Sequence, residues 1–158
     1  MEYKLGLYEK SMPNDWSFAQ KLSMTAACGF DQLEISIDES EEKLARLTDV
    51  DATSRELLCA MAQSGTPVRT MCLSGHRRFP FGSHDAETRR RSLAIMRRAI
   101  ELSAQTGIRI IQLAGYDVYY EDSDESTKQY FLETLARASE LAASAAVILA
   151  FETMETPF

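Results

Sequence analysis

The stretch QLEISID, residues 32–38, alternates strictly between apolar and polar side chains. Successive side chains of a strand point to opposite faces, so Leu33, Ile35 and Ile37 share one face and the polar residues share the other. Similar alternation recurs in four further runs that favour strands: Lys4–Tyr8, Val68–Leu73, Arg109–Leu113 and Val147–Glu152. Each predicted strand therefore has one apolar face and one face of small or polar side chains.

Helical periodicity fills the intervals between these strands and predicts four helices, at Trp16–Cys28, Ser54–Ser64, 85–106 and 125–143. We expect Asn14 or Asp15 to cap the first of them. Gly29, Gly65 and Gly107 each separate a helix from the next strand, and we expect all three in left-handed conformation. The second to fifth strands begin at 32, 68, 109 and 147, a regular spacing that indicates repeating βα units and a parallel sheet.

Two architectures use such units, and the polar strand face discriminates between them. A doubly wound, flavodoxin-like sheet fits 158 residues, but both of its faces are covered by helices and its strands should be apolar throughout. A (β/α)8 barrel needs about 250 residues, and its strands turn one face toward the lumen. We therefore expect residues 1–158 to be a single domain, the N-terminal portion of an incomplete (β/α)8 TIM barrel. A strand order of 2-1-3-4-5 would instead support the flavodoxin-like alternative.

Composition narrows the classes of function. The chain is 45% hydrophobic and 26% charged, as soluble globular proteins are, and its net charge of −7 argues against nucleic acid or an anionic membrane as partner. Three cysteines without a CxxC pair fit a reducing cytoplasm. The sequence has no signal-peptide pattern, and its longest nearly apolar run, 141–151, is too short for a membrane span. Walker-type, GxGxxG and GxSxG motifs are absent, so we expect a small-molecule ligand of another kind.

Ligands of parallel α/β sheets bind at the carboxyl ends of the strands, where this sequence has several polar residues. Glu152 closes an apolar run on the lumen face, a costly position for a carboxylate unless it is paired or bound to a metal. It is either a metal ligand or acid/base group, or a strand-end residue that lies in water or pairs with Lys4 or an arginine. Glu34 lies mid-strand, and we expect it in a buried structural ion pair.

The loop after the third strand, SGHRRFP, places His76 beside two arginines, Arg77 and Arg78. Such a loop could bind a phosphate or polarise a carbonyl, or it could be an ordinary surface loop. Tyr116 could wall a substrate pocket or take part in aromatic packing. Two histidines cannot build a His-rich multinuclear metal site, and Glu152 with His76 or Asp38 would be an incomplete mononuclear set.

Six segments carry a resemblance to a known family: LGLYEK (5–10), LEISIDESEEKLARL (33–47), MCLSGHRRFPFGS (71–83), IMRRAI (95–100), GIRIIQLAGYDVYY (107–120) and LAFETM (149–154). In one register over the whole chain, they resemble the L-ribulose-5-phosphate (L-xylulose-5-phosphate) 3-epimerases of L-ascorbate and pentulose catabolism. These enzymes belong to the xylose isomerase-like barrel superfamily.

The resemblance implies a metal-dependent isomerase acting on a pentulose phosphate. A divalent metal, Zn or Mn, is held in that family by two glutamates, an aspartate and a histidine, and Glu152 matches the first glutamate. The metal polarises the ketose carbonyl and stabilises a cis-enediolate, while two glutamates exchange the C3 proton on opposite faces. Glu152 would thus be metal ligand and acid/base residue. Five residues would help to form the substrate pocket: Ser74, His76, Arg77, Gly115 and Tyr116.

The other metal ligands would come from later strands, so we expect the 158-residue chain to be incompetent as an epimerase on its own. Open sheet edges favour self-association, and a homo-oligomer is expected. Two alternatives stay open: a non-catalytic half-barrel that serves as a binding or interaction module, and a complete flavodoxin-like domain that binds a phosphorylated ligand. A DNA-repair relative with the same barrel is disfavoured by the net charge and the scarcity of histidine.

Overall fold

The computed structural model describes residues 3–154. Their five strands form one parallel sheet in the order β1-β2-β3-β4-β5. The strands are β1 (Gly6–Tyr8), β2 (Gln32–Ile37), β3 (Val68–Leu73), β4 (Ile110–Ala114) and β5 (Ile148–Glu152). Each strand pairs in parallel with the next one along the chain. This sequential order confirms the partial barrel and excludes the flavodoxin-like order 2-1-3-4-5.

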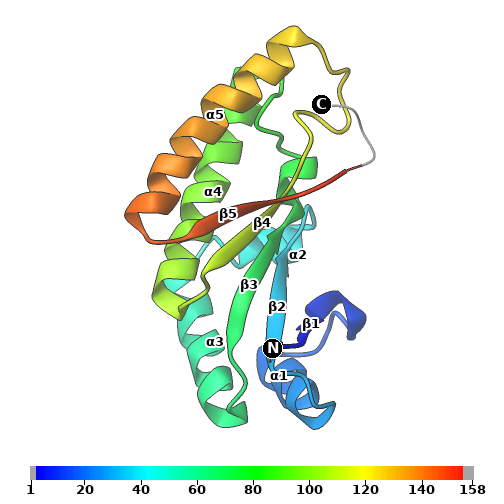
Figure 1. The fold of residues 1–158 in the computed structure, drawn as a ribbon, viewed down its shortest axis with the longest axis vertical. Helices are drawn as coiled ribbons and strands as arrows, with labels where there is room; N and C mark the ends of the chain where they lie inside the picture. Colours follow the sequence, from blue (N-terminus) through cyan, green and yellow to red (C-terminus); the bar gives the residue numbers. More distant parts are fainter. Residues whose placement is uncertain (1–2, 155–158) are drawn as a thin grey trace.

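Helices follow the strands as the repeating unit requires. They are α1 (Phe18–Ala27), α2 (Glu41–Ala45), α3 (Val50–Ser64), α4 (Ala86–Thr106) and α5 (Glu125–Ser144), with 3-10 turns η1 (Glu9–Ser11) and η2 (Ser74–Arg77). Figure 1 shows α3, α4 and α5 along one side of the twisted sheet, with β5 in red at one of its edges. Across residues 3–154, no helix combines the length and the apolar character that crossing a bilayer requires.

The apolar strand face forms the core, as the alternation predicts. Leu33, Ile35 and Ile37 of β2 have no exposed surface, and Met71 and Ile111 on the neighbouring strands are equally buried. Full burial of a side chain of this size contributes about 1.5–3 kcal/mol relative to exposure. The central strands thus anchor the sheet to the helices and leave the polar face to build a site.

The ends of the helices follow from local capping, which corrects two of the predicted starts. Ser17, not Asn14 or Asp15, caps α1, since its hydroxyl accepts a hydrogen bond from the Gln20 amide and Gln20 returns one in a capping box. Helix α3 begins at Val50, four residues before the prediction, because the Asp49 side chain accepts from the amide of the first turn.

The helix-ending glycines behave as predicted. Gly65 and Gly107 are the C-caps of α3 and α4, with φ of 70° and 79°, and Gly29 just after α1 has φ of 79°. Residues without a side chain adopt this left-handed conformation at little cost, which lets the chain turn directly into the next strand.

Candidate active site

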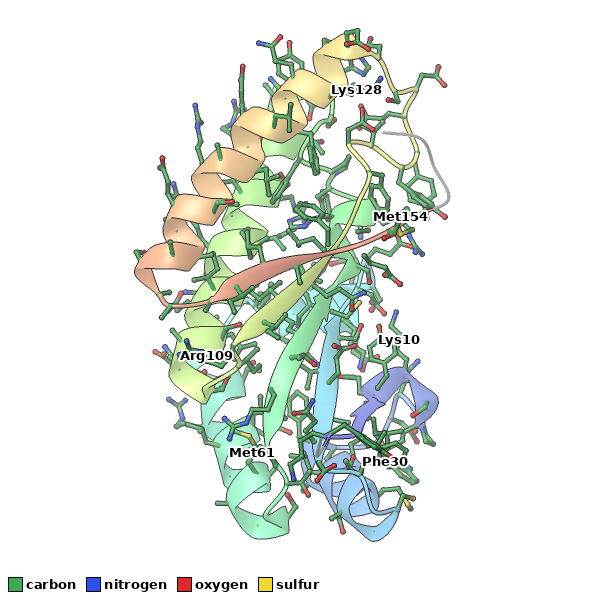
Figure 2. All side chains as sticks on the ribbon, in the orientation of Figure 1. Lys10, Phe30, Met61, Arg109, Lys128 and Met154 are labelled. Atoms are coloured by element: carbon green, nitrogen blue, oxygen red, sulfur yellow. The ribbon has the colours of Figure 1, made fainter. Side chains whose placement is uncertain are left out.

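The polar strand faces meet in a pocket of about 420 Å³ at the carboxyl ends of the sheet. Its lining includes Tyr8 and Lys10, Glu34, Cys72, Ser74, Arg77, Gln112, Tyr116, Glu152 and Met154. Figure 2 labels two of these, Lys10 and Met154, which lie on the side of the sheet away from α3, α4 and α5. All five strands or their following loops contribute, so the barrel geometry gathers residues that are far apart in sequence.

Glu152 stands at the end of β5 with an exposed carboxylate. The Gln112 side chain on the neighbouring strand β4 donates a hydrogen bond from Nε2 to Glu152 Oε2 over 2.8 Å. The alternative pairing with Lys4 does not occur, because Lys4 Nζ lies 3.2 Å from Asp31 Oδ1 instead. Within residues 3–154 no ion pair involves Glu152, so its charge is available to a ligand.

Three further predicted residues, Ser74, Arg77 and Tyr116, line the same pocket as Glu152. Gly115 contributes through its backbone: its amide donates to the Glu152 carbonyl over 3.1 Å, and a Cβ at this position would lie 3.0 Å from that oxygen. A side chain at residue 115 would therefore push the two strand ends apart.

His76 lies in the core behind this pocket instead of lining it. Its ring is 4.3 Å from that of Phe81, and Nε2 lies 3.1 Å from the carbonyl oxygen of Ser92. Burial lowers the pKa of His76 to about 4 despite the raising effect of the Ser92 carbonyl, so the ring is neutral at pH 7 and Nε2 donates to Ser92. The predicted contact of His76 with substrate has no support from this geometry.

Glu34 differs from the prediction as well. It is half-buried, lines the pocket and makes no ion pair within the described part of the chain, because its position in β2 faces the lumen. The buried ion cluster lies one strand away, at Glu9.

Glu9 follows β1 and is completely buried, with three cations around its carboxylate. Arg46 donates to Oε2 over 2.7 Å, Lys21 lies 3.2 Å from Oε1, and Lys43 also donates to Oε1. The Ser36 amide of β2 adds a fourth hydrogen bond, over 2.9 Å. Burial would raise the pKa of Glu9, but Arg46, Lys43 and the Ser36 amide outweigh it and lower the pKa to about 2.

Tyr8 and Lys10 are polar residues at the end of the first predicted strand that also line the pocket, although the sequence assigned no role to them. Lys10 Nζ lies 2.8 Å from Asp38 Oδ2, and although burial opposes it, Lys10 and the hydroxyl and amide of Ser40 lower the pKa of Asp38 to about 2. The Tyr8 hydroxyl lies 3.3 Å from Ser36 Oγ, and burial raises its pKa. Both residues lie at the carboxyl end of β1, and this position in the sequence was the signal that they line the pocket.

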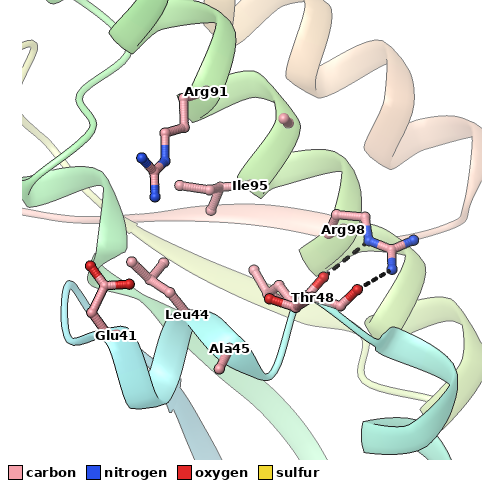
Figure 3. A pocket seen from close by; sticks show the side chains of 9 residues that line it. Glu41, Leu44, Ala45, Thr48, Arg91, Ile95 and Arg98 are labelled. Carbon is pink, nitrogen blue, oxygen red and sulfur yellow. Dashed lines mark hydrogen bonds between the residues drawn. The ribbon is translucent and has the colours of Figure 1, made fainter.

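A second hollow of about 310 Å³ lies on the outer side of the molecule, between α2 and α4 (Figure 3). Arg98 donates from Nε to the Leu47 carbonyl over 3.1 Å and from Nη2 to the Thr48 carbonyl over 3.2 Å, as the dashed lines in Figure 3 show. These bonds fix the segment after α2 against α4. The hollow is therefore a packing feature, separate from the strand-end pocket.

The strand-end pocket does not contain a complete metal site. Among residues 3–154, no group of three or more His, Cys, Asp or Glu side chains is arranged to hold a metal ion. The described residues thus supply a single candidate metal-coordinating side chain, Glu152, and not the four coordinating residues that the resemblance implies.

The family model described as "Xylose isomerase-like TIM barrel" matches residues 22–158. The chain is 51% identical over 157 residues to "Putative L-ribulose-5-phosphate 3-epimerase SgbU" of Haemophilus influenzae, covering 99% of this chain and 55% of the relative. It is 43% identical over 153 residues to "L-ribulose-5-phosphate 3-epimerase UlaE" of Shigella boydii, covering 97% of this chain and 54% of the relative. The chain thus spans about half the length of the curated relatives it matches.

Solved structures of low sequence identity share the fold. A D-tagatose 3-epimerase-like protein aligns with a TM-score of 0.77 at 15% identity, over 98% of this chain and 54% of its own. D-psicose 3-epimerase aligns with a TM-score of 0.74 at 17% identity, over 93% of this chain and 51% of its own. At this level of identity the likeness concerns the arrangement of strands and helices alone.

Proposed function

The chain belongs to the xylose isomerase-like TIM barrel family, and we propose that it forms the N-terminal portion of a ketopentose-5-phosphate 3-epimerase. The substrates we assign are L-ribulose 5-phosphate and L-xylulose 5-phosphate, on the basis of the names of relatives at 43–51% identity and the family resemblance. One observation carries the proposal: an exposed glutamate, Glu152, lies in a pocket at the carboxyl ends of the strands and has no ionic partner among residues 3–154.

Epimerisation at C3 requires removal of the proton beside the ketose carbonyl and its return on the opposite face. We assign Glu152 to one of these two proton transfers. Gln112 holds Oε2 through its 2.8 Å hydrogen bond, and we assign the other oxygen, Oε1, to the proton at C3. A fixed carboxylate of this kind needs no reorganisation when the substrate binds, which lowers the barrier to proton transfer.

In the family that the chain resembles, a divalent Zn or Mn ion stabilises the charge that develops on the enediolate oxygens. Residues 3–154 do not contain a complete metal centre, so the other ligands of such an ion would have to come from outside these residues. We propose Glu152 as one of its ligands. We also propose that the 158 residues alone turn over little or no substrate.

A chimera tests the proposal with a complete barrel. This chain would replace the matching segment of the 51% identical Haemophilus influenzae relative, and exchange of the C3 proton of L-ribulose 5-phosphate would be followed by NMR in D2O. We expect turnover by the chimera, a fall of about 10²–10⁴-fold with Glu152→Gln, and no change with Glu140→Gln on the exposed side of α5. The proposal is wrong if the folded chimera is inactive, or if Glu152→Gln retains full activity.

The same experiment separates the epimerase from a non-catalytic half-barrel module. A chimera that folds but neither binds nor converts a pentulose phosphate would favour the module. The partner that we propose is the small-molecule sugar phosphate, in the cytoplasm. We also propose that the protein forms a homo-oligomer.

A further inference from the structure

Two loops border the strand-end pocket at the end of the molecule where α4 and α5 begin (Figure 1). Loop 78–85 leads from η2 into α4, and loop 115–124 leads from β4 into α5. Arg77, directly before the first loop, and Tyr116, within the second, both line the pocket. The contacts that hold the two loops together therefore affect the wall of the pocket.

The loops meet through their backbones. The Gly82 amide of the first loop donates a hydrogen bond to the Asp117 carbonyl of the second over 3.0 Å. A Cβ at Gly82 would lie 2.5 Å from the Thr127 carbonyl oxygen and 2.8 Å from that of Asp117, so the contact leaves no room for a side chain. The buried Asp117 carboxylate accepts hydrogen bonds from the hydroxyls of Ser123 and Thr127, which fixes the second loop.

One side chain, His84, joins the first loop to two carboxylates of the second. Its Nε2 lies 3.1 Å from Asp124 Oδ2, and its Nδ1 lies 3.5 Å from Glu121 Oε2. The backbone amide of His84 donates to the same Glu121 oxygen over 3.0 Å. A neutral imidazole has a hydrogen on only one of its nitrogens, so only the imidazolium presents a donor to both carboxylates. The arrangement is thus complete only when the ring is charged.

The remaining charged groups close to His84 have partners of their own. Arg89 of α4 donates to the carbonyl oxygen of His84 over 3.0 Å, and its guanidinium carbon lies 3.9 Å from the centroid of the Tyr130 ring. Asp85 accepts hydrogen bonds from the amide and the hydroxyl of Thr88 at the start of α4. The two carboxylates of the second loop are therefore the groups that govern the charge of the ring.

These carboxylates make the two histidines of the chain differ in their titration. The hydrogen bond to Asp124, with a smaller contribution from Glu121, raises the pKa of His84 above its ordinary 6.5 and outweighs desolvation, which lowers it. Burial instead lowers the pKa of His76 to about 4, so that ring is neutral at pH 7. His84 is thus the histidine that changes its charge near neutral pH.

We propose that His84 is a pH-dependent clasp between loops 78–85 and 115–124: its imidazolium holds both Glu121 and Asp124, and loss of one proton releases one of these carboxylates. Exposed ion pairs contribute modestly to stability, so the release loosens the contact between the loops and does not unfold them. His84 does not line the pocket and acts on the pocket wall through the loops, as a positioning residue.

Proton NMR of the 158-residue chain tests the clasp, because its two histidines give separate titration curves. We expect the pKa of His84 to fall in Asp124→Asn and, by a smaller amount, in Glu121→Gln. Asparagine keeps the side-chain oxygen that caps α5, so helix capping is preserved. Glu140→Gln, an equal charge change on the exposed side of α5, should leave this pKa unchanged. The clasp is wrong if neither of the first two variants lowers the pKa.

Hydrogen exchange at the Gly82 amide measures whether the charged ring holds the loops. At pH 5.5 the protection factor of this amide should be about twofold to tenfold higher in the parent chain than in His84→Gln. The ratio should approach one as His84 loses its proton, a pH profile that a side chain with a purely structural role would not produce. A ratio that stays at one, or that does not change with pH, would overturn the proposal. Neither measurement uses a sugar, so the result is independent of the proposed function.

Discussion

Glu9 and Glu152 both stand at the carboxyl ends of strands in the same sheet, but their surroundings are opposite. Glu9 is completely buried and contacts three cations, whereas Glu152 is exposed and, within residues 3–154, its carboxylate accepts a hydrogen bond from the neutral amide of Gln112. The charge of Glu9 is balanced by its partners, whereas the charge of Glu152 is available to a ligand. A glutamate at a strand end is thus either a structural group or a chemical one, and its tertiary partners decide which.

The partners of Glu9 explain why its role is structural. Lys21 comes from α1, Lys43 from α2 and Arg46 from the C-cap of α2, so a single carboxylate joins two helices to the start of the sheet. Burying such charges gains little over an apolar core, but removing one partner leaves the others uncompensated. The predictions that follow test this contrast between a saturated and an available carboxylate.

The largest effect is expected from Glu9→Gln. The variant keeps the size of the side chain but leaves three cations without their shared anion, and it should lower the free energy of unfolding by about 3–5 kcal/mol. The matched variant Glu152→Gln should change it by less than about 0.5 kcal/mol, because the group is exposed. Urea unfolding measures the stability of both variants. Equal losses in the free energy of unfolding would show that the two carboxylates do not differ in their structural role.

Lowering the pH should reduce the stability of the folded protein by protonating the same carboxylate, Glu9. The pKa of Glu9 is about 2 in the folded protein, below its ordinary 4.5, so the unfolded chain binds the proton more tightly. The resulting stability is present above pH 4.5 and is lost as the pH falls toward 2, by about 3 kcal/mol in all. Unfolding curves between pH 7 and pH 3 should show this loss in the parent chain and a smaller one in Glu9→Gln. An equal loss of stability with falling pH in the parent chain and in Glu9→Gln would contradict this prediction.

Removal of one cation, Lys21, should lower the free energy of unfolding by less than removal of the Glu9 charge does. Lys21 has no exposed surface, and burial lowers its pKa although Glu9 raises it. Lys21→Met keeps the apolar stem and leaves Glu9 paired with Lys43 and Arg46, so we expect a loss of about 1–2 kcal/mol. A loss as large as that of Glu9→Gln in the same urea titration would mean that Lys21 dominates the cluster.

The smallest effect on stability is expected beside Glu152. Gln112→Ala removes the amide that holds the carboxylate, and it should change the free energy of unfolding by less than about 0.5 kcal/mol. In the chimera the same variant should lower epimerisation about tenfold, because a misplaced base transfers protons poorly. Full activity with Gln112→Ala would show that Glu152 needs no positioning.

The sequence predicts those features that depend on near neighbours. Alternation in QLEISID places Leu33, Ile35 and Ile37 in the core and correctly predicts a barrel face, since strand parity is a local property. The placement of Glu152 in a strand-end pocket follows from the same parity. The start of α1 was missed although Ser17 and Gln20 form the S-x-x-Q pattern of a capping box, which is a local signal in the sequence.

Features that depend on distant partners escaped prediction. Glu9 is separated from its cations by 12 to 37 residues, and no local pattern indicates that they meet. His76 was correctly assigned to a strand-end loop, but the 3-10 turn of η2 directs its ring into the core against Phe81. Arg77, the next residue, lines the pocket instead, so a turn of a few residues separates the two roles.

The burial of His76 also keeps the charge of this side chain constant when the acidity changes mildly. An imidazole that titrates near pH 4 has no charge to gain or lose between pH 5 and pH 8. A sugar phosphate does change charge in that interval, because the second ionisation of a phosphate monoester lies near pH 6. In the proposed complex, the phosphate of the metabolite and not the His76 ring would thus change its charge in this interval.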